Sequence, residues 1–141
     1  MADNFGLKIG IEGEKEFKKA LSEINQSFKV LGSEMKLVSS QFAANDKSIL
    51  ALSARNTVLN KEIDAQRQKI ETLRAALQNA SESFGENDRR TQNWQIQLNN
   101  AEAALNGMER ELSANERAIE SLSRQETEAA DATERLSQEI S

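Results

Sequence analysis

From Phe17 to Ile140 the sequence repeats apolar residues at the alternating three- and four-residue spacing of a heptad. With Leu21 as position a, 28 of the 36 a and d positions in this stretch are apolar, against 38% for the whole chain. This spacing is typical of helices that pack against one another along a stripe, and we call the a and d positions the seam. The sequence therefore predicts an all-α protein whose long helices form a coiled coil.

The large apolar residues of the seam are the predicted helix–helix contacts. They are Phe17, Leu21, Ile24, Phe28, Leu31, Met35, Val38, Phe42, Ile49, Leu52, Leu59, Ile63, Ile70, Leu73, Leu77, Trp94, Leu98, Leu105, Met108, Leu112, Ile119, Leu122, Leu136 and Ile140. Position c is apolar too in the middle of the chain, and this c row comprises Val30, Leu37, Ala44, Ala51, Val58 and Ala65. So wide an apolar face predicts contact with more than one neighbouring helix.

Composition argues against several classes of function. The chain of 141 residues has no Cys, and therefore no thiolate nucleophile. It also has no His, which is the commonest general base and metal ligand. We therefore expect no enzymatic activity, no cofactor and no metal site. No apolar run approaches the roughly 20 residues of a membrane span, and the N-terminus lacks a signal-peptide pattern, so we expect a soluble chain. The net charge of −5 disfavours a nucleic-acid site.

Charge is unevenly distributed along the chain. Residues 1–80 hold 12 Lys/Arg and 10 Asp/Glu, whereas residues 81–141 hold 6 Arg, no Lys and 13 Asp/Glu. If the two parts lie side by side, a weakly basic helix runs along an acidic one.

Residues 1–13 are predicted to form a separate N-terminal strand or arm. Phe5, Leu7, Ile9 and Ile11 recur with a period of two, which indicates a short half-buried strand. Four apolar residues cannot make a sheet alone, so the strand either pairs with another subunit or protein or is a loosely held arm. Gly13 ends the pattern, and a first long helix with a wide apolar seam is predicted over residues 14–84.

A turn or weak point is predicted over residues 85–91, before a second, acidic helix over residues 92–141. Gly85 suits the left-handed position after a helix, and Asn87, Asp88 or Thr91 can cap the next one. The turn itself would comprise Gly85, Glu86, Asn87 and Asp88. The heptad phase continues across Gly85, however, so two structures stay open: a hairpin turning at residues 85–88, or one continuous helix in a parallel oligomer.

Polar residues within the seam are predicted to set the helix register, as buried polar residues do in coiled coils. They are Asn45, Asn56, Gln66, Asn115 and Glu126. A hairpin centred on the predicted turn pairs residues whose numbers sum to 171, which layers Asn56 with Asn115 and Asn45 with Glu126. A parallel oligomer would stack each polar residue on its own copy. Trp94, at a d position, is expected in the core or as a plug at the end of a bundle.

Two segments go beyond a generic heptad pattern. The first reads Glu14-Lys15-Glu16-Phe17-Lys18-Lys19-Ala20-Leu21, then Ile24-Asn25, Phe28-Lys29, Leu31-Gly32-Ser33-Glu34-Met35-Lys36 and Ser40-Gln41-Phe42. The second reads Phe84-Gly85-Glu86-Asn87-Asp88, then Thr91, Trp94, Leu98-Asn99, Ala101-Glu102 and Leu105. Within residues 5–110, these segments resemble the N-terminal region of tail tape-measure proteins of long-tailed bacteriophages and prophages.

The resemblance implies a structural protein of the virion that lies extended in the tail lumen, sets tail length during assembly and leaves at DNA ejection. It implies contacts with tail tube subunits, tail assembly chaperones and tail-tip or terminator proteins, first in the bacterial host cytoplasm. Self-association is expected from the seam itself. It also implies that these residues are an N-terminal part of a longer protein. The alternative is a generic coiled-coil adaptor or scaffold without a viral role, which requires only the heptads.

Overall fold

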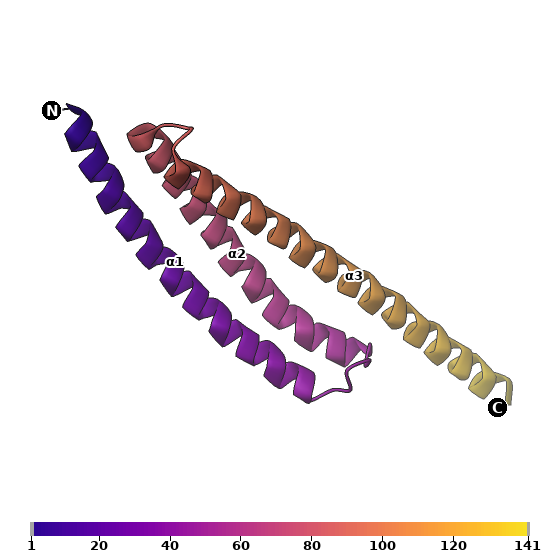
Figure 1. Cartoon of the computed structure of the whole chain (residues 1–141). Helices are drawn as coiled ribbons and strands as arrows, with labels where there is room; N and C mark the ends of the chain where they lie inside the picture. The colour runs from indigo at the N-terminus through magenta and orange to yellow at the C-terminus, as the bar shows by residue number, and fades with distance from the viewer. Residues whose placement is uncertain (1, 141) are drawn as a thin grey trace.

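The computed structural model describes the backbone of residues 2–140 and the side chains of residues 10–139. Three long helices make up this part of the chain: α1 (Ala2–Ser40), α2 (Ile49–Phe84) and α3 (Arg89–Ile140). Residues 41–48 join α1 to α2, and residues 85–88 join α2 to α3 (Figure 1). Residues 2–140 contain no strand, and the all-α class is confirmed.

α2 is the central helix, and α1 and α3 each pack along it (Figure 1). Lys61 of α2 pairs with Glu34 of α1, and Lys69 of α2 pairs with Asn25, so α1 runs antiparallel to α2. α3 runs back along α2 in the same way. The chain thus goes up, down and up again through helices joined by short loops.

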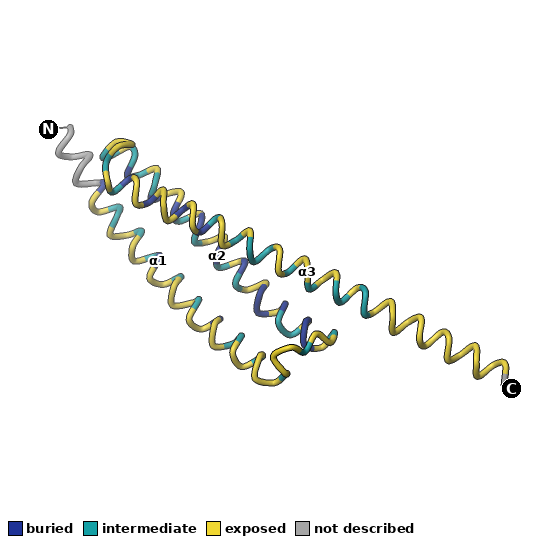
Figure 2. Tube along the Cα trace, turned by 45° about the vertical axis from the view of Figure 1, so that its right-hand side comes forward, coloured by how far each residue is buried: buried dark blue, intermediate teal, exposed yellow. Residues whose placement is uncertain are grey.

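Burial is concentrated on α2, because this helix is covered from two sides (Figure 2). Its buried residues are Ala51, Leu52, Asn56, Val58, Leu59, Ile63, Gln66, Ile70, Leu73, Ala76 and Ala80. The c row is more buried on α2 than on α1. Ala51 and Val58 on α2 are buried, whereas Val30 and Leu37 on α1 are 51% and 62% exposed.

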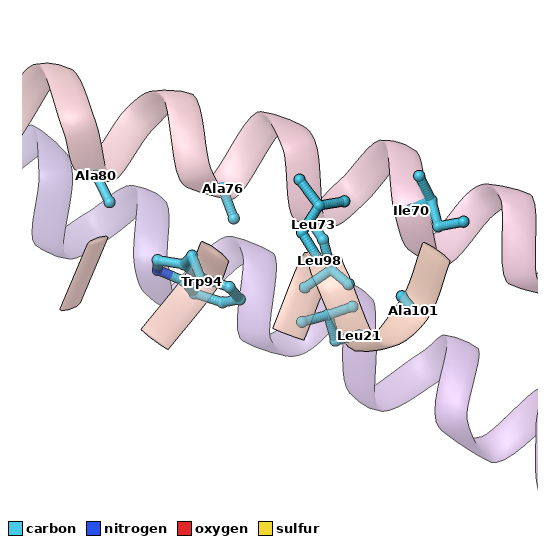
Figure 3. Close-up of a cluster of buried hydrophobic side chains, with 8 residues drawn as sticks. All are labelled: Leu21, Ile70, Leu73, Ala76, Ala80, Trp94, Leu98 and Ala101. Carbon is cyan, nitrogen blue, oxygen red and sulfur yellow. The ribbon is translucent and has the colours of Figure 1, made fainter. Parts of the chain in front are cut away.

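The main core lies near the turn between α2 and α3, where all three helices contribute side chains (Figure 3). Leu21 comes from α1, Leu73 from α2, and Trp94 and Leu98 from α3. Leu73 is fully buried and Trp94 is 3% exposed. Burying side chains of this size stabilises the fold by roughly 1.5–3 kcal/mol each.

The predicted N-terminal strand is wrong, because residues 5–11 lie within α1. Apolar residues that alternate over only seven positions also stand four apart. Residues four apart share one face of a helix. An alternation this short therefore does not distinguish a strand from a helix. A strand would also need partner strands for stability, and the described residues provide none.

The predicted uninterrupted helix over residues 14–84 is also wrong, because residues 41–48 form a loop. Ser48 caps α2, since its Oγ accepts a hydrogen bond from the Ala51 N–H at 3.3 Å. Asp46 Oδ1 accepts one from the Ser48 N–H at 2.8 Å. Short polar side chains compete in this way with the hydrogen bonds of a continuing helix, and no Gly or Pro is needed to end it.

The C-terminal part of α3 extends beyond the loop between α1 and α2 (Figure 1). Leu122 is the last half-buried residue, and every side chain from Ser123 to Glu139 is exposed. We call residues 123–140 the overhang. The predicted seam contact of Leu136 is therefore not made, because α2 begins at Ile49 and reaches no further along α3.

Candidate functional site

The two faces along which α2 meets α1 and α3 are the candidate functional site, because the predicted seam residues gather there. The buried ones are Leu21, Leu31, Leu52, Leu59, Ile63, Ile70, Leu73, Trp94 and Leu98. The half-buried ones are Phe17, Ile24, Phe28, Met35, Val38, Phe42, Ile49, Leu77, Leu105, Met108, Leu112, Ile119 and Leu122. Leu136 is 59% exposed, and the side chain of Ile140 lies outside the described residues.

Two polar contacts lie within the interface of α2 and α3. Asn115 Nδ2 donates to Asn56 Oδ1 at 2.9 Å, a pair whose residue numbers sum to 171. Gln66 Nε2 donates to the Ala101 carbonyl at 2.9 Å. Asn56 and Gln66 are buried, and an amide buried without a partner costs about 1–3 kcal/mol, so these bonds favour one alignment of the two helices.

The predicted pairing of Asn45 with Glu126 is absent. Asn45 lies exposed in the loop between α1 and α2, and Glu126 lies exposed in the overhang. The loop turns α1 back along α2, which removes Asn45 from the line of the helix on which the pairing depends.

The turn at residues 85–88 depends on the backbone of Gly85. Its φ of 91° is one that other residues rarely adopt. The Gly85 N–H donates to the Ser81 carbonyl at 3.0 Å, and its carbonyl accepts from Thr91 Oγ1 at 2.7 Å. Thr91 is a buried polar seam residue, and this bond satisfies its hydroxyl. Glu86 and Asn87, in the middle of the turn, are exposed.

Asp88 directly precedes α3 and fixes its start. Its Oδ1 accepts from the Arg90 N–H at 2.9 Å, and its carboxylate also pairs with the Arg90 guanidinium at 3.0 Å. Both bonds hold the pKa of Asp88 below its ordinary value, and the bond with the Arg90 side chain has the larger effect. The guanidinium carbon lies 3.5 Å from the centre of the Phe84 ring, so Arg90 also connects the two ends of the turn.

Trp94 links α1 to α3. Its Nε1–H donates to Glu14 Oε1 at 3.1 Å, while its ring is buried in the main core. The sequence indicates a core position for Trp94, but it assigns Glu14 only to the start of a helix. Eighty residues separate the two positions, so no local pattern predicts their contact.

Glycines allow the N-terminal half of α1 to approach α2 closely, a role that sequence reasoning missed. A Cβ placed on Gly10 would lie 2.5 Å from Ser83 Cβ, and one on Gly13 would lie 2.7 Å from Asn79 Nδ2. Asn79 Nδ2 also donates to the Gly10 carbonyl at 3.2 Å. The signal was available in the sequence, because two glycines three residues apart share a helix face.

Ion pairs border the interfaces without dominating them. Arg67 pairs with Glu109 at 3.3 Å and Arg74 with Glu102 at 3.0 Å, so α2 supplies the cations and α3 the anions. Exposed pairs of this kind contribute up to about 1 kcal/mol each.

Partial burial raises the pKa of Glu62, also on α2, above its ordinary value, and the nearby Glu111 adds a smaller effect.

Neither a metal-binding cluster nor a membrane-spanning helix occurs in the part of the chain that the structure describes. No group of three or more Asp and Glu side chains is placed there to hold a metal ion. Nor is any described helix both long enough and apolar enough to cross a membrane. The described side chains form helix–helix contacts and hydrogen bonds within the loops that join the helices.

Comparison with known proteins identifies no relative: no protein-family model, no curated protein and no solved structure matches this chain. The features of the chain that bear on its function are therefore the helix interfaces and the two segments within residues 14–42 and 84–105.

Proposed function

We propose that this chain is a structural protein that acts through helix packing, as the N-terminal part of the tape-measure protein of a long-tailed phage or prophage. In this proposal α2 and α3 are the two arms of an antiparallel coiled-coil hairpin. The proposal depends chiefly on α3, which runs for 52 residues without interruption. At 1.5 Å per residue such a helix spans about 78 Å, so it converts residue number directly into length.

The residues on which the family resemblance depends support this proposal through their positions. The second segment, from Phe84 to Leu105, forms the turn between α2 and α3 and the start of α3. Its Trp94, Leu98 and Ala101 belong to the main core. The first segment lies on α1, where Leu21 and Leu31 are buried. The resembling residues thus have structural roles in this chain.

The proposed location and partners follow from the resemblance. The protein would assemble in the bacterial host cytoplasm with tail assembly chaperones and then lie in the lumen of the virion tail. There it would contact tail tube subunits and tail-tip or terminator proteins. Self-association would use the same kind of helix face that α2 presents to α1 and α3.

The ruler role is tested by changing residue number while keeping the heptad phase. A phage variant that duplicates residues 92–133, which are six heptads, gains about 63 Å of helix. We expect its tails, measured by electron microscopy, to be longer by about this amount. The matched control is Leu112→Ala, which weakens the seam without changing residue number and is expected to leave tail length unchanged.

Tails of unchanged length in the duplication variant would contradict the ruler and leave the generic adaptor as the better description. So would a Leu112→Ala variant whose tails change length, because seam strength rather than residue number would then govern the result.

A further inference from the structure

The loop over residues 41–48 interrupts the helices without shifting the phase of the seam. Phe42 and Asn45 occupy a and d positions within the loop, and they continue the spacing from Val38 on α1 to Ile49 on α2. The loop contains neither Gly nor Pro. If it became helical, α1 and α2 would form one straight helix over residues 2–84 with an unbroken seam.

A straight helix would cover the overhang. In the register of Asn56 with Asn115, where residue numbers sum to 171, residues 123–140 lie against residues 31–48. Leu136 would then meet Met35, and Ala129 would meet Phe42. In the folded-back chain Leu136 is 59% exposed and Phe42 is half-buried, so straightening would give both a larger apolar contact.

The c row is symmetric about its own centre. Its six residues are centred between Lys47 and Ser48, so two antiparallel copies of the straight helix pair residues whose numbers sum to 95. Leu37 would meet Val58 of the second copy, and Val30 would meet Ala65. The row is thus complementary to itself across a two-fold axis, which is the arrangement of most homodimer interfaces.

We propose that residues 41–48 are a hinge, and that two copies of this chain open at the hinge and form an antiparallel dimer through the c row. In each copy residues 31–84 of the straightened helix then lie along residues 87–140 of its own chain, overhang included. This inference goes beyond the proposed function and stands on register and burial alone.

Opening is coupled to dimerisation, because a single open chain loses more apolar contact than it gains. In the folded-back chain Ala51 and Val58 are 0% and 4% exposed, and Leu21 of α1 is 6% exposed in the main core. When α1 swings away, Leu21 leaves the core, and the α2 face that packs against α1 stays open until the second copy covers it. A dilute chain therefore stays folded back, and rising concentration favours the open dimer.

A few polar contacts hold the hinge in its folded-back form. Arg55 donates to the Asp46 carbonyl at 2.7 Å and to the Ala43 carbonyl at 3.4 Å, and Ser48 caps α2. Removal of the cap by Ser48→Ala weakens the folded-back form without affecting the c row or the seam. The lost cap counts once for each of the two chains, so we expect this variant to dimerise at about thirtyfold lower concentration.

The opening is measured by the distance between spin labels on Asn25→Cys and Lys69→Cys, introduced into a chain that has no cysteine of its own. In the folded-back chain these two side chains are in contact at 3.3 Å. In one straight helix the 44 residues between them span about 66 Å. Labelled chains are diluted into excess unlabelled chain, so that only distances within one chain are read.

We expect only the short distance at low concentration, and a distance near 66 Å in proportion to the dimer fraction found by light scattering. A dimer that retains only the short distance would contradict the hinge. So would a chain that stays monomeric up to millimolar concentration.

The c row is tested by Leu37→Lys, at a side chain that is 62% exposed in the folded-back monomer. We expect at least tenfold weaker dimerisation and an unchanged monomer. The matched control is Leu50→Lys, which alters a 72% exposed leucine outside the c row and the seam and is expected to leave dimerisation unchanged.

The contact of the overhang with the straightened helix is tested by Leu136→Lys, which should also weaken the dimer. Equal effects of Leu37→Lys and Leu50→Lys, or no effect of Leu136→Lys, would overturn the proposed interface.

Discussion

Asn115 on α3 donates a hydrogen bond of 2.9 Å to Asn56 on α2, within a largely apolar interface. A shift of one helix by a few residues would separate the two amides and leave both without this bond. The pair therefore favours the register in which residue numbers sum to 171, and with it the alignment of every other contact between α2 and α3.

Replacing one member of the pair is expected to cost more than replacing both. Asn115→Leu leaves the Asn56 amide buried without its partner and should lower the free energy of unfolding by about 1–3 kcal/mol, as read from urea denaturation. Asn56→Leu should cost less, because Asn115 is only half-buried. The double variant should recover most of the loss. A double variant as unstable as the sum of the two single ones would show that the amides do not act as a pair.

Close packing of α1 on α2 predicts opposite effects of one substitution at two glycines. Gly10→Ala puts a Cβ 2.5 Å from Ser83 Cβ, which forces the helices apart, so we expect destabilisation despite the better helix propensity of Ala. Gly32→Ala meets nothing within 4 Å and should stabilise the chain by up to about 1 kcal/mol. Urea denaturation compares the two. Similar stabilisation by both would mean that α1 does not approach α2 closely near Gly10.

The turn at residues 85–88 predicts a stability contribution that disappears in acid. The folded chain holds the pKa of Asp88 below its ordinary value near 3.8, mainly through the hydrogen bond with Arg90. The contribution is therefore present above that ordinary value and lost as the pH falls through the folded value. Asp88→Asn keeps a capping side chain but removes the charge. We expect it to be less stable than the parent chain at pH 7, and the difference in urea midpoint should vanish in strong acid.

Glu62 predicts the opposite dependence on pH. Burial raises its pKa above the ordinary value of 4.5 in the folded chain, so its ionised form opposes folding once the pH exceeds that value. Glu62→Gln should therefore be more stable than the parent chain at pH 7, and this advantage should shrink as the pH falls through the raised pKa and disappear below the ordinary value of 4.5. An advantage that persists in acid would have to come from packing rather than charge.

The helical class and the pairing of Asn56 with Asn115 can be reached from the sequence, because both follow from a periodic pattern. Gly85 and Asp88 are recognisable as well, since a left-handed residue and a helix cap need particular side chains. The loop over residues 41–48 could not be read from the seam, whose phase continues through it. Its signal lies in Asp46 and Ser48, whose short polar side chains bind nearby backbone.

Contacts between distant residues were the least accessible. Trp94 and Glu14 stand eighty positions apart, and nothing in either local pattern indicates the other. Gly10 was misread as part of a strand: its spacing from Gly13 indicates a shared helix face, but the residue that this face approaches, Ser83, lies on a second helix. The exposure of Leu136 likewise follows from where α2 begins rather than from the heptad position of Leu136 itself.

The dilute chain folds back twice, and its maximum dimension in solution measures this directly. Small-angle X-ray scattering at low concentration should give about 80–100 Å, the length of α3 with its side chains. A straight helix over residues 2–84 would give about 125 Å, and one continuous helix about 200 Å. A value near 80–100 Å agrees with the three-helix fold, and a dilute chain at 125 Å or more would contradict it.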